Sequence, residues 1–413
     1  MKYHITAPFH LKEEIILPSS KSISNRVLII NNLSDFPKHI DNISVCDDTN
    51  VMINALTKNQ HDINIKAAGT AMRFLTAYFA CMKGKWILTG TERMKNRPIK
   101  ILVDALCKAG ACIEYVEKEG FPPLRIKGQT LMGGEVVLDG SVSSQYISAL
   151  LLMAPIMTNG LRLHLKGEII SKPYIRLTIN LMRRYGVIVY EDNQIFTVPP
   201  QQYSCVNNFS VEPDWSSASY WYEMVALSRD EDAEVKLPGL RQDSLQGDSN
   251  IVQLFDLLGV NTTFTSSGAV LSKCKPTARK PFVYDFVSMP DMAQTAAVTC
   301  CMLNIPFMFS GLQSLKIKET DRLEALKTEL LKLGFPLYIH EDKILAWLGK
   351  RIKSEDFPVI NTYEDHRMAM SFTPVSLILN EGLFISNPKV VSKSYPKFWN
   401  DIKSSGFKID ITD

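Results

Sequence analysis

The sequence lacks an apolar run long enough to cross a membrane. Its longest candidate, residues 147–157, has about half the length that a transmembrane helix needs. The first residues also lack the charged-then-apolar pattern of a signal peptide. We therefore expect a cytoplasmic protein that does not bind membranes.

Paired cysteines and blocks of like charge are missing as well. The eight cysteines form no C-x-x-C pair, and Cys300 and Cys301 lie in an apolar stretch. This usage predicts reduced, mostly buried thiols and no metal site. The net charge is only +3 and no segment concentrates one sign of charge, so nucleic acid is not an expected partner.

One local pattern recurs along the chain: an amphipathic helix ends at a glycine, and a short apolar strand follows. Each glycine suits the left-handed position that closes a helix, and residues 112–115 and 187–190 alternate or run apolar as strands do. A weaker copy over residues 51–65 brings the number to six. The five clear copies end at Gly110, Gly186, Gly259, Gly334 and Gly406, which are 76, 73, 75 and 72 residues apart.

A repeat of this length indicates symmetry-related α/β units rather than a single wound sheet. The alternative is coincidence, because Leu-x-x-Leu-x-x-x-Gly is a common helix ending, but the nearly constant spacing favours a true repeat. Six units divide naturally into two domains of three. The 413 residues contain no linker rich in Gly, Pro or Ser, so any junction between domains must be short.

Residues 18–26, PSSKSISNR, concentrate hydroxyls and cations before an apolar run. Ser19, Ser20 or Ser22 can cap a helix there, and the N-terminus of a helix carries partial positive charge. Lys21 and Arg26 add full charges, so the segment suits a phosphate or carboxylate. An ordinary serine-rich helix cap with solvated basic residues explains the segment alone equally well.

Further segments place basic residues beside Gly, Ser or Thr. Residues 68–73 (AGTAMR) predict another helix N-terminus aimed at a ligand, and residues 93–98 (RMKNRP) put three cations before a helix start at Pro98. Residues 141–145 (SVSSQ) offer neutral donors ahead of an apolar helix over 146–153. A solvated turn or a plain N-cap explains each of these segments when that segment is considered alone.

Acidic and basic residues mix in the second half of the chain. Residues 318–322 (KETDR) open a helix, residues 365–370 (DHRMAM) set an acid, an imidazole and a guanidinium before another, and Asp291 precedes a small-residue helix over 293–299. A carboxylate beside a lysine can be tuned for proton transfer. Salt bridges on a helix surface are the alternative for residues 318–322.

The ordered set of these segments, with SKPY at 171–174 and SSASY at 216–220, closely resembles the 3-phosphoshikimate 1-carboxyvinyltransferase (EPSP synthase) family from about Pro18 to Pro396. The resemblance implies an α/β fold of two domains, each of three βαβαββ units in an inside-out barrel. The domains would span residues 20–211 and residues 1–19 plus 212–413. It also implies a monomer that acts on small anions, with no metal or organic cofactor.

The resemblance further implies which residues bind each substrate. Catalytic roles fall to Asp291, Glu319, Lys21 and Lys318. The shikimate-3-phosphate contacts would be Lys21, Ser22, Arg26, Ser143, Ser144, Gln145, Ser171, Tyr174, Asp291 and Lys318. The phosphoenolpyruvate contacts would be Lys21, Gly69, Thr70, Arg97, Gln145, Arg322, Arg367 and Lys393, with Arg73 supporting that pocket.

The family reaction transfers the enolpyruvyl group of phosphoenolpyruvate to the 5-hydroxyl of shikimate-3-phosphate and releases phosphate. Asp291 would contact the attacking hydroxyl, Glu319 would exchange a proton with the methylene carbon, and Lys318 would assist the leaving phosphate; the sequence leaves either carboxylate able to serve either step. Two alternatives are a UDP-N-acetylglucosamine enolpyruvyl transferase and a non-catalytic anion-binding paralogue. The first usually has Lys-Asn where this chain has Lys21-Ser22, and carries a reactive loop cysteine that is not found here.

The chain departs from the family pattern in the segment before Gly69. The family usually has Gly-Asn where this chain has Lys66 and Ala67, and Pro where it has Phe74. Lys66 either restores positive charge or points to solvent. We expect the affinity for phosphoenolpyruvate to differ from that of the family norm.

Overall fold

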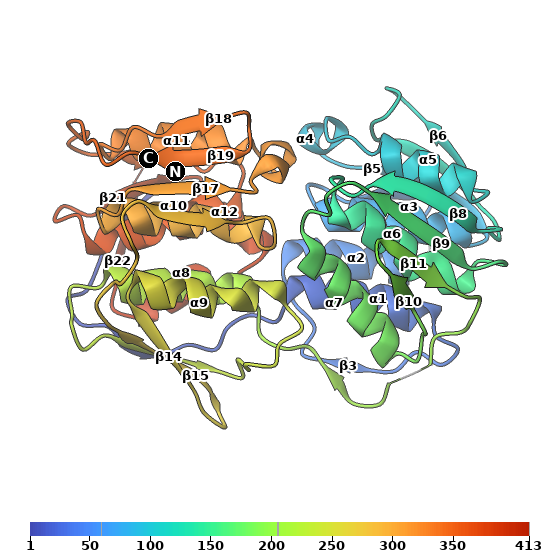
Figure 1. Cartoon of the computed structure of the whole chain (residues 1–413), viewed down its shortest axis with the longest axis horizontal. Helices are drawn as coiled ribbons and strands as arrows, with labels where there is room; N and C mark the ends of the chain where they lie inside the picture. The colour runs from blue at the N-terminus through green and yellow to red at the C-terminus, as the bar shows by residue number, and fades with distance from the viewer. Residues whose placement is uncertain (59, 205, 413) are drawn as a thin grey trace. The chain divides into compact units, whose positions relative to one another are not determined.

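The computed structural model describes residues 1–58, 60–204 and 206–412. The chain divides into two compact units. The inserted unit is Ser19–Val211, and the terminal unit joins Met1–Pro18 to Glu212–Asp413 (Figure 1).

Over its described residues, 19–58, 60–204 and 206–211, the inserted unit contains seven α-helices, two four-stranded sheets and one two-stranded sheet. Its helices are α1 (Lys21–Leu33), α2 (Asp47–Thr57), α3 (Gly69–Cys81), α4 (Glu92–Lys95), α5 (Lys100–Lys108), α6 (Ser144–Met153) and α7 (Lys172–Arg184). Its strands, in sheet order, are β4 (Asp62–Asn64), β5 (Gly84–Thr89), β7 (Leu124–Gly128) and β6 (Cys112–Tyr115); β10 (Tyr190–Asp192), β11 (Ile195–Val198), β9 (Leu161–Lys166) and β8 (Gly134–Asp139); and β12 (Phe209–Ser210) with β3 (Ile40–Asp41).

In residues 1–18 and 212–412, the described part of the terminal unit, there are six α-helices and three four-stranded sheets. Its helices are α8 (Trp215–Leu227), α9 (Ile251–Leu258), α10 (Ala293–Met302), α11 (Arg322–Lys332), α12 (His366–Phe372) and α13 (Phe398–Ser404). Its strands, in sheet order, are β14 (Val260–Phe264), β15 (Gly268–Lys273), β13 (Glu234–Pro238) and β2 (Lys12–Glu14); β16 (Phe282–Asp285), β17 (Phe307–Ser310), β19 (Ile344–Trp347) and β18 (Tyr338–His340); and β20 (Val359–Ile360), β21 (Leu383–Ser386), β1 (Lys2–Thr6) and β22 (Lys408–Thr412).

All five four-stranded sheets have the same topology. In the sheet β4-β5-β7-β6, the first two strands are parallel and the other pairings are antiparallel. The sheet that contains β1 follows this order too, with β20 parallel to β21 and β1 antiparallel to both of its neighbours. The repeat predicted from the helix endings is therefore a repeat of βαβαββ units. The sixth copy is reduced to the parallel pair β3 and β12.

The glycines of the repeat close their helices as predicted. Their φ angles lie between 80° and 105°, in the left-handed region that glycine enters without a steric penalty. A residue with a Cβ would be strained at each of these helix ends. The five copies therefore share one local cause for where the helix stops and the next strand starts.

Helices occupy the middle of each unit and the sheets lie outside them (Figure 1). In the terminal unit, every residue of α10 and α12 is buried, as are all but one of α8. In the inserted unit, nine of the ten residues of α6 are buried. A helix that is buried all round needs few polar positions, which explains the apolar run at residues 149–153. The predicted inside-out α/β fold is confirmed.

Three sequence predictions are wrong in detail. The strand expected at 187–190 begins only at Tyr190, the first residue of β10, and residues 187–189 belong to no helix or strand. The helix expected at Pro98 begins at Lys100 with Ile99 as its N-cap, and Arg93 and Lys95 belong to the separate short helix α4. Of the seven described cysteines, three are buried, two are partly exposed (Cys81 and Cys274) and two are exposed (Cys107 on α5 and Cys112 on β6).

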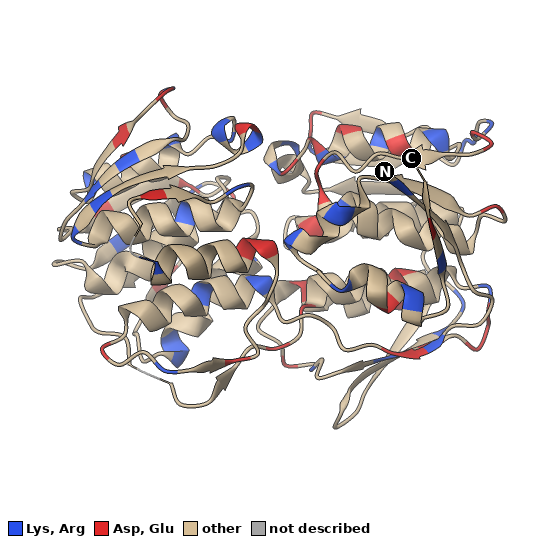
Figure 2. Ribbon diagram, turned by 180° about the vertical axis from the view of Figure 1, so that it is seen from behind, with Lys and Arg blue, Asp and Glu red and all other residues tan. Residues whose placement is uncertain are grey.

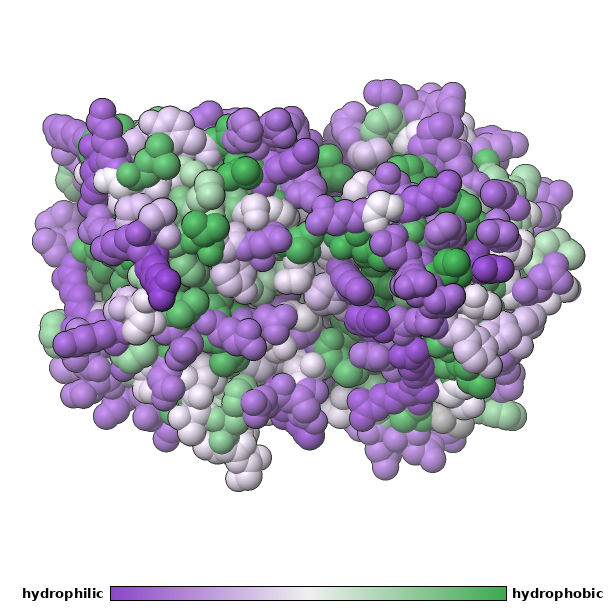
Figure 3. All heavy atoms as spheres, viewed as in Figure 1, coloured by the Kyte–Doolittle hydropathy of each residue, from purple (hydrophilic) through white to green (hydrophobic). Residues whose placement is uncertain are grey.

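Charged residues of both signs are interspersed over the ribbons of each unit (Figure 2). The face shown in Figure 3 is mostly hydrophilic, with hydrophobic residues between the polar ones. Among the described residues, none of the helices has the length and apolar character that spanning a membrane requires.

Candidate active site

In the inserted unit, the predicted substrate residues gather at helix N-termini. Helix α1 begins at Lys21, α3 at Gly69, α6 at Ser144 and α7 at Lys172. Free backbone N–H groups and the helix dipole make each of these ends attractive to an anion. The predicted substrate residues therefore lie at four helix N-termini, each of which can attract an anion.

The start of α1 is fixed by a serine cap. The Ser20 hydroxyl accepts a hydrogen bond from the Ile23 amide at 3.4 Å, as the sequence predicts. The Lys21 ammonium, in the first turn, lies 3.1 Å from the Asp48 carboxylate. Asp48 was not singled out by sequence reasoning, since it stands 27 residues away on α2. This ion pair fixes the position of the Lys21 side chain.

Arg26 is a buried cation one turn further along α1. Only 3% of the residue is exposed. Its Nε donates to Thr178 Oγ1 at 2.7 Å and its Nη1 to the Ser22 carbonyl at 2.8 Å. Its Nη2 donates to Ser148 Oγ at 3.4 Å and to the Tyr174 carbonyl at 3.3 Å. Burial lowers the pKa of Arg26 to about 10, which still leaves it charged at neutral pH.

Ser171 and Tyr174 frame the start of α7. Ser171 is buried and has a φ of 55°, a left-handed conformation that is uncommon for a residue other than glycine. Backbone strain of this kind is often found at ligand sites. Tyr174 contributes its carbonyl to Arg26, so α7 is tied directly to α1.

The starts of α3 and α6 also meet. Gln145 Nε2 donates to Thr70 Oγ1 at 3.2 Å, and Ser143 caps α6 by accepting from the Gln145 amide. A Cβ placed on Gly69 would lie 2.7 Å from Arg97 Nη1, so the guanidinium passes directly over this glycine. Arg73 donates to the carbonyls of Gly69 and Pro98, which gives it a supporting place behind Arg97.

The resemblance implies that Arg97 binds phosphoenolpyruvate, and on that expectation we predict that Gly69→Ala raises the KM for phosphoenolpyruvate about tenfold or more, because misplacing a binding group by about 1 Å can cost about 100-fold. The methyl group would displace the guanidinium of Arg97 without straining the helix. Steady-state kinetics and thermal unfolding test this. If Gly69→Ala acts by displacing Arg97, it should raise the KM for phosphoenolpyruvate little further in a protein that already carries Arg97→Ala. A rise in KM that is as large in the Arg97→Ala background as in wild type would contradict the explanation.

Lys66 shows what the departure before Gly69 does locally. Its φ is 53°, in the left-handed region, at the position where the family pattern has glycine. Its amide donates to Asn64 Oδ1 at 2.8 Å, and its carbonyl accepts from the Thr91 amide at 3.0 Å. The residue is exposed, which favours the reading in which it points to solvent.

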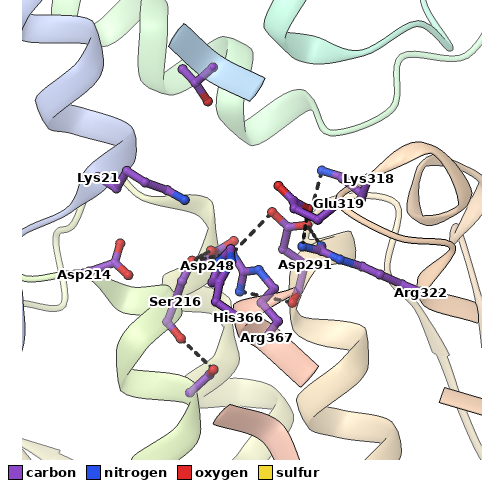
Figure 4. Close-up of polar contacts among 12 residues, drawn as sticks. Lys21, Asp214, Ser216, Asp248, Asp291, Lys318, Glu319, Arg322, His366 and Arg367 are labelled. Atoms are coloured by element: carbon purple, nitrogen blue, oxygen red, sulfur yellow. Dashed lines mark hydrogen bonds and ion pairs between the residues drawn. The ribbon is translucent and has the colours of Figure 1, made fainter. Parts of the chain in front are cut away.

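In the terminal unit, three cations surround Asp291 (Figure 4). Its Oδ1 lies 3.2 Å from Lys318 Nζ and 2.7 Å from Arg322 Nη1, and its Oδ2 lies 3.4 Å from Arg367 Nη2. Burial alone would raise the pKa of Asp291, but Lys318, Arg367 and Arg322 outweigh it and hold that pKa well below its usual value. Asp291 is therefore a carboxylate at any physiological pH.

Arg322 connects three carboxylates. This residue is 2% exposed and starts α11, with Asp321 as its N-cap. Besides Asp291, its guanidinium contacts Glu319 Oε2 at 2.8 Å and Asp365 Oδ2 at 2.7 Å. The pair with Glu319 has the i,i+3 spacing of the salt bridges that the sequence allowed, but Glu319 precedes the helix, which begins at Arg322. The pairs with Asp291 and Asp365 are long-range and make the segment a buried network instead of a surface one.

Arg367 extends this network toward α8. Its amide donates to Asp365 Oδ1 at 2.9 Å, so Asp365 caps α12 while it pairs with Arg322. Its Nη2 donates to Ser216 Oγ at 3.3 Å, and the Ser216 hydroxyl in turn donates to Asp248. Sequence reasoning missed Asp248, because no charged neighbour in the sequence marks it.

Asp248 provides a pH-dependent prediction. Burial raises its pKa to about 6; Asp291 and Asp214 add to the shift, and Arg367 and Ser216 oppose it. Because the pKa of Asp248 is higher in the folded state than in the unfolded state, the ionisation of this residue favours unfolding. Stability is therefore lost as the pH rises from the ordinary pKa of an aspartate, near 4, to about 6. Relative to Asp248→Asn, we expect wild type to lose of the order of 3 kcal/mol of unfolding free energy over that interval and little above it.

Urea unfolding at pH 4.5, 6 and 7.5 measures this difference. Asp243→Asn, a change of the same kind at an exposed residue of the same segment, is the matched control and should show no such interval. A difference between wild type and Asp248→Asn that does not vary with pH would show that Asp248 does not titrate in this range.

The remaining predicted residue, Lys393, lies in the 3₁₀ turn Pro388–Lys393 and donates to the Glu364 carbonyl at 2.6 Å. Within the described ranges, no group of three or more histidine, cysteine, aspartate or glutamate residues is arranged to hold a metal ion.

Comparison with known proteins gives the family. The model of EPSP synthase (3-phosphoshikimate 1-carboxyvinyltransferase) matches residues 57–402. The chain belongs to the EPSP synthase family. A 3-phosphoshikimate 1-carboxyvinyltransferase from Bacteroides fragilis (strain YCH46) is 54% identical over 412 residues, which cover 100% of this chain and 99% of the relative. The corresponding protein from Vibrio campbellii is 35% identical, covering 95% of this chain and 97% of the relative.

The solved structures agree on the fold. An EPSP synthase from Acinetobacter baumannii superposes with a TM-score of 0.76 at 18% identity and covers 99% of this chain and 100% of that one. The prediction of an enzyme of the EPSP synthase family, a transferase of the shikimate pathway, is confirmed. The UDP-N-acetylglucosamine enzyme and the non-catalytic paralogue are not favoured.

Proposed function

We propose that this chain transfers the enolpyruvyl group of phosphoenolpyruvate to the 5-hydroxyl of shikimate-3-phosphate with the residues described above. The observation that carries the proposal is Asp291, an ionised carboxylate within 3.4 Å of three cations. Such a group can accept a proton from a hydroxyl while the surrounding cations attract anionic substrates.

The inserted unit would supply binding groups for both substrates. Shikimate-3-phosphate would be held by Lys21, Ser22, Arg26, Ser143, Ser144, Gln145, Ser171 and Tyr174, with Asp291 and Lys318 of the terminal unit. Phosphoenolpyruvate would be held by Lys21, Gly69, Thr70, Arg97 and Gln145 of the inserted unit and by Arg322, Arg367 and Lys393 of the terminal unit. Support comes from the helix N-termini and from the buried, charged state of Arg26.

The proposed reaction has two stages. The 5-hydroxyl oxygen bonds to C2 of phosphoenolpyruvate as its proton passes to Asp291, and Glu319 protonates the methylene carbon. The tetrahedral intermediate then returns a proton from that methyl carbon to Glu319. The C2–O bond to phosphate breaks with Lys318 stabilising the leaving charge, and the proton held by Asp291 passes to the leaving phosphate. Over the two stages Glu319 starts and ends protonated, and Asp291 starts and ends as a carboxylate.

The substrate assignment is tested at Arg26. We expect Arg26→Lys to weaken binding of shikimate-3-phosphate in calorimetric titration, because a point charge cannot replace the planar guanidinium. Arg184→Lys is the matched control, since Arg184 belongs to the same unit and contacts an aromatic ring, that of Phe209. Equal affinities of Arg26→Lys and wild type would remove Arg26 from the site.

The proposal includes a monomer in the cytoplasm that does not bind nucleic acid. Its support is the small net charge of +3 and the mixture of signs over both units (Figure 2). Analytical ultracentrifugation at assay concentration gives the mass that decides the oligomeric state.

A further inference from the structure

An aromatic ring stands beside the buried cation of the proposed shikimate-3-phosphate site. The Cζ atom of Arg26 on α1 lies 5.4 Å from the centroid of the Phe74 ring on α3. Phe74 is completely buried, and Arg26 is 3% exposed, so water does not screen the contact. This distance is within the range in which the negative face of a ring attracts a cation.

Arg26 depends on neutral groups for its stabilisation. Its four hydrogen bonds go to two hydroxyls and two carbonyls. No ion pair links Arg26 to a carboxylate anywhere in residues 1–58, 60–204 and 206–412, and burial is the main influence on its pKa. A buried charge without a counter-ion is costly, and such a site favours an incoming anion.

Phe74 is also where this chain departs from its family pattern, which has proline at this position. A proline ring has no π face to offer a guanidinium. The ring contact is therefore supplied by this chain's own residue, on the helix whose first residues are Gly69 and Thr70.

We propose that Phe74 is a positioning residue for shikimate-3-phosphate: its ring holds the Arg26 guanidinium in the place where an anionic group of that substrate meets it. The inference rests on the proposed function, because it assumes that Arg26 binds this substrate. The four hydrogen bonds use four of the five N–H groups of Arg26 and leave one on Nη1, which suits a group held ready for a further acceptor.

A role in packing alone predicts a different result. Phe74 lies in the second turn of α3, so a general disturbance of that helix would move Gly69 and Thr70, the proposed phosphoenolpyruvate contacts. The two roles therefore differ in which substrate is affected.

Phe74→Leu and Phe74→Met both remove the ring and keep an apolar side chain, and Met preserves most of the volume. We expect each to raise the dissociation constant of shikimate-3-phosphate about tenfold, the loss typical of a desolvated cation–π contact, while the KM for phosphoenolpyruvate at saturating shikimate-3-phosphate stays within about twofold. Phe79→Leu is the matched control, since Phe79 lies on the same helix, is 4% exposed and stacks on Trp86 instead. It should change neither constant.

The inference is overturned if the Phe74 variants leave the shikimate-3-phosphate affinity unchanged, if they alter mainly the KM for phosphoenolpyruvate, or if Phe79→Leu has the same effect. Arg26→Lys separates this failure from that of the proposed function. If Arg26→Lys weakens binding but the Phe74 variants do not, only the role of Phe74 is wrong. If Arg26→Lys has no effect, the proposed site is wrong as well.

Discussion

Asp291→Asn lowers kcat by about 10²- to 10⁴-fold, the range expected when a general acid or base is removed. The amide has nearly the same shape as the carboxylate, but it cannot take up the proton of the 5-hydroxyl. It also leaves Lys318, Arg322 and Arg367 without the negative charge that now lies within 3.4 Å of each. Single-turnover kinetics at saturating concentrations of both substrates measures the loss in the chemical step.

Asp342→Asn is the matched control for Asp291→Asn. Asp342 lies in the same unit and pairs with Lys316, but both side chains are about half exposed. Its kcat should equal that of wild type. An Asp291→Asn variant that keeps more than a tenth of the wild-type kcat would exclude Asp291 as a proton-transfer group.

Arg322→Lys is expected to reduce kcat/KM for phosphoenolpyruvate about 10³-fold and the free energy of unfolding by about 3 kcal/mol, as the breaking of a buried ion-pair network does. The guanidinium now reaches Asp291, Glu319 and Asp365 from three of its sides. A lysine keeps the charge but has a single ammonium, so it cannot satisfy three carboxylates at once. Those carboxylates would then repel one another.

Arg229→Lys provides the control for this change. Arg229 is an exposed residue of the same unit whose Nη2 donates to the Ile378 carbonyl and to Asn380. Its replacement should alter unfolding by well under 1 kcal/mol, the usual size of a surface effect. Wild-type stability in Arg322→Lys would contradict the view that this arginine holds the network together.

The sequence predicts the repeat well because its signal is local. A glycine in the left-handed region ends the helix in each copy, and this requirement is visible in the chain itself, as at Gly259 and Gly334. The pairing of β1 with β21 and β22 has no such signal. It joins residues 2–6 to residues 383–386 and 408–412, and short strands at these separations carry no mark of their partners.

The residues of the candidate site also differ in whether the sequence reveals them. Residues at helix starts, such as Ser20 and Asp365, combine capping preference with charge and are visible in the sequence. Residues that reach the site only through tertiary contacts are not visible in the sequence. Asp48 meets Lys21 across 27 positions, and Phe74 meets Arg26 across two helices, so only the folded chain shows these contacts.

The central claim is the transfer itself, and phosphate release from purified protein tests it most directly. The assay supplies phosphoenolpyruvate with shikimate-3-phosphate, each substrate alone, and phosphoenolpyruvate with UDP-N-acetylglucosamine, and mass spectrometry identifies the product. We predict release only when phosphoenolpyruvate and shikimate-3-phosphate are both present, with formation of the enolpyruvyl ether. Release with UDP-N-acetylglucosamine, or no release with either acceptor, would contradict the account.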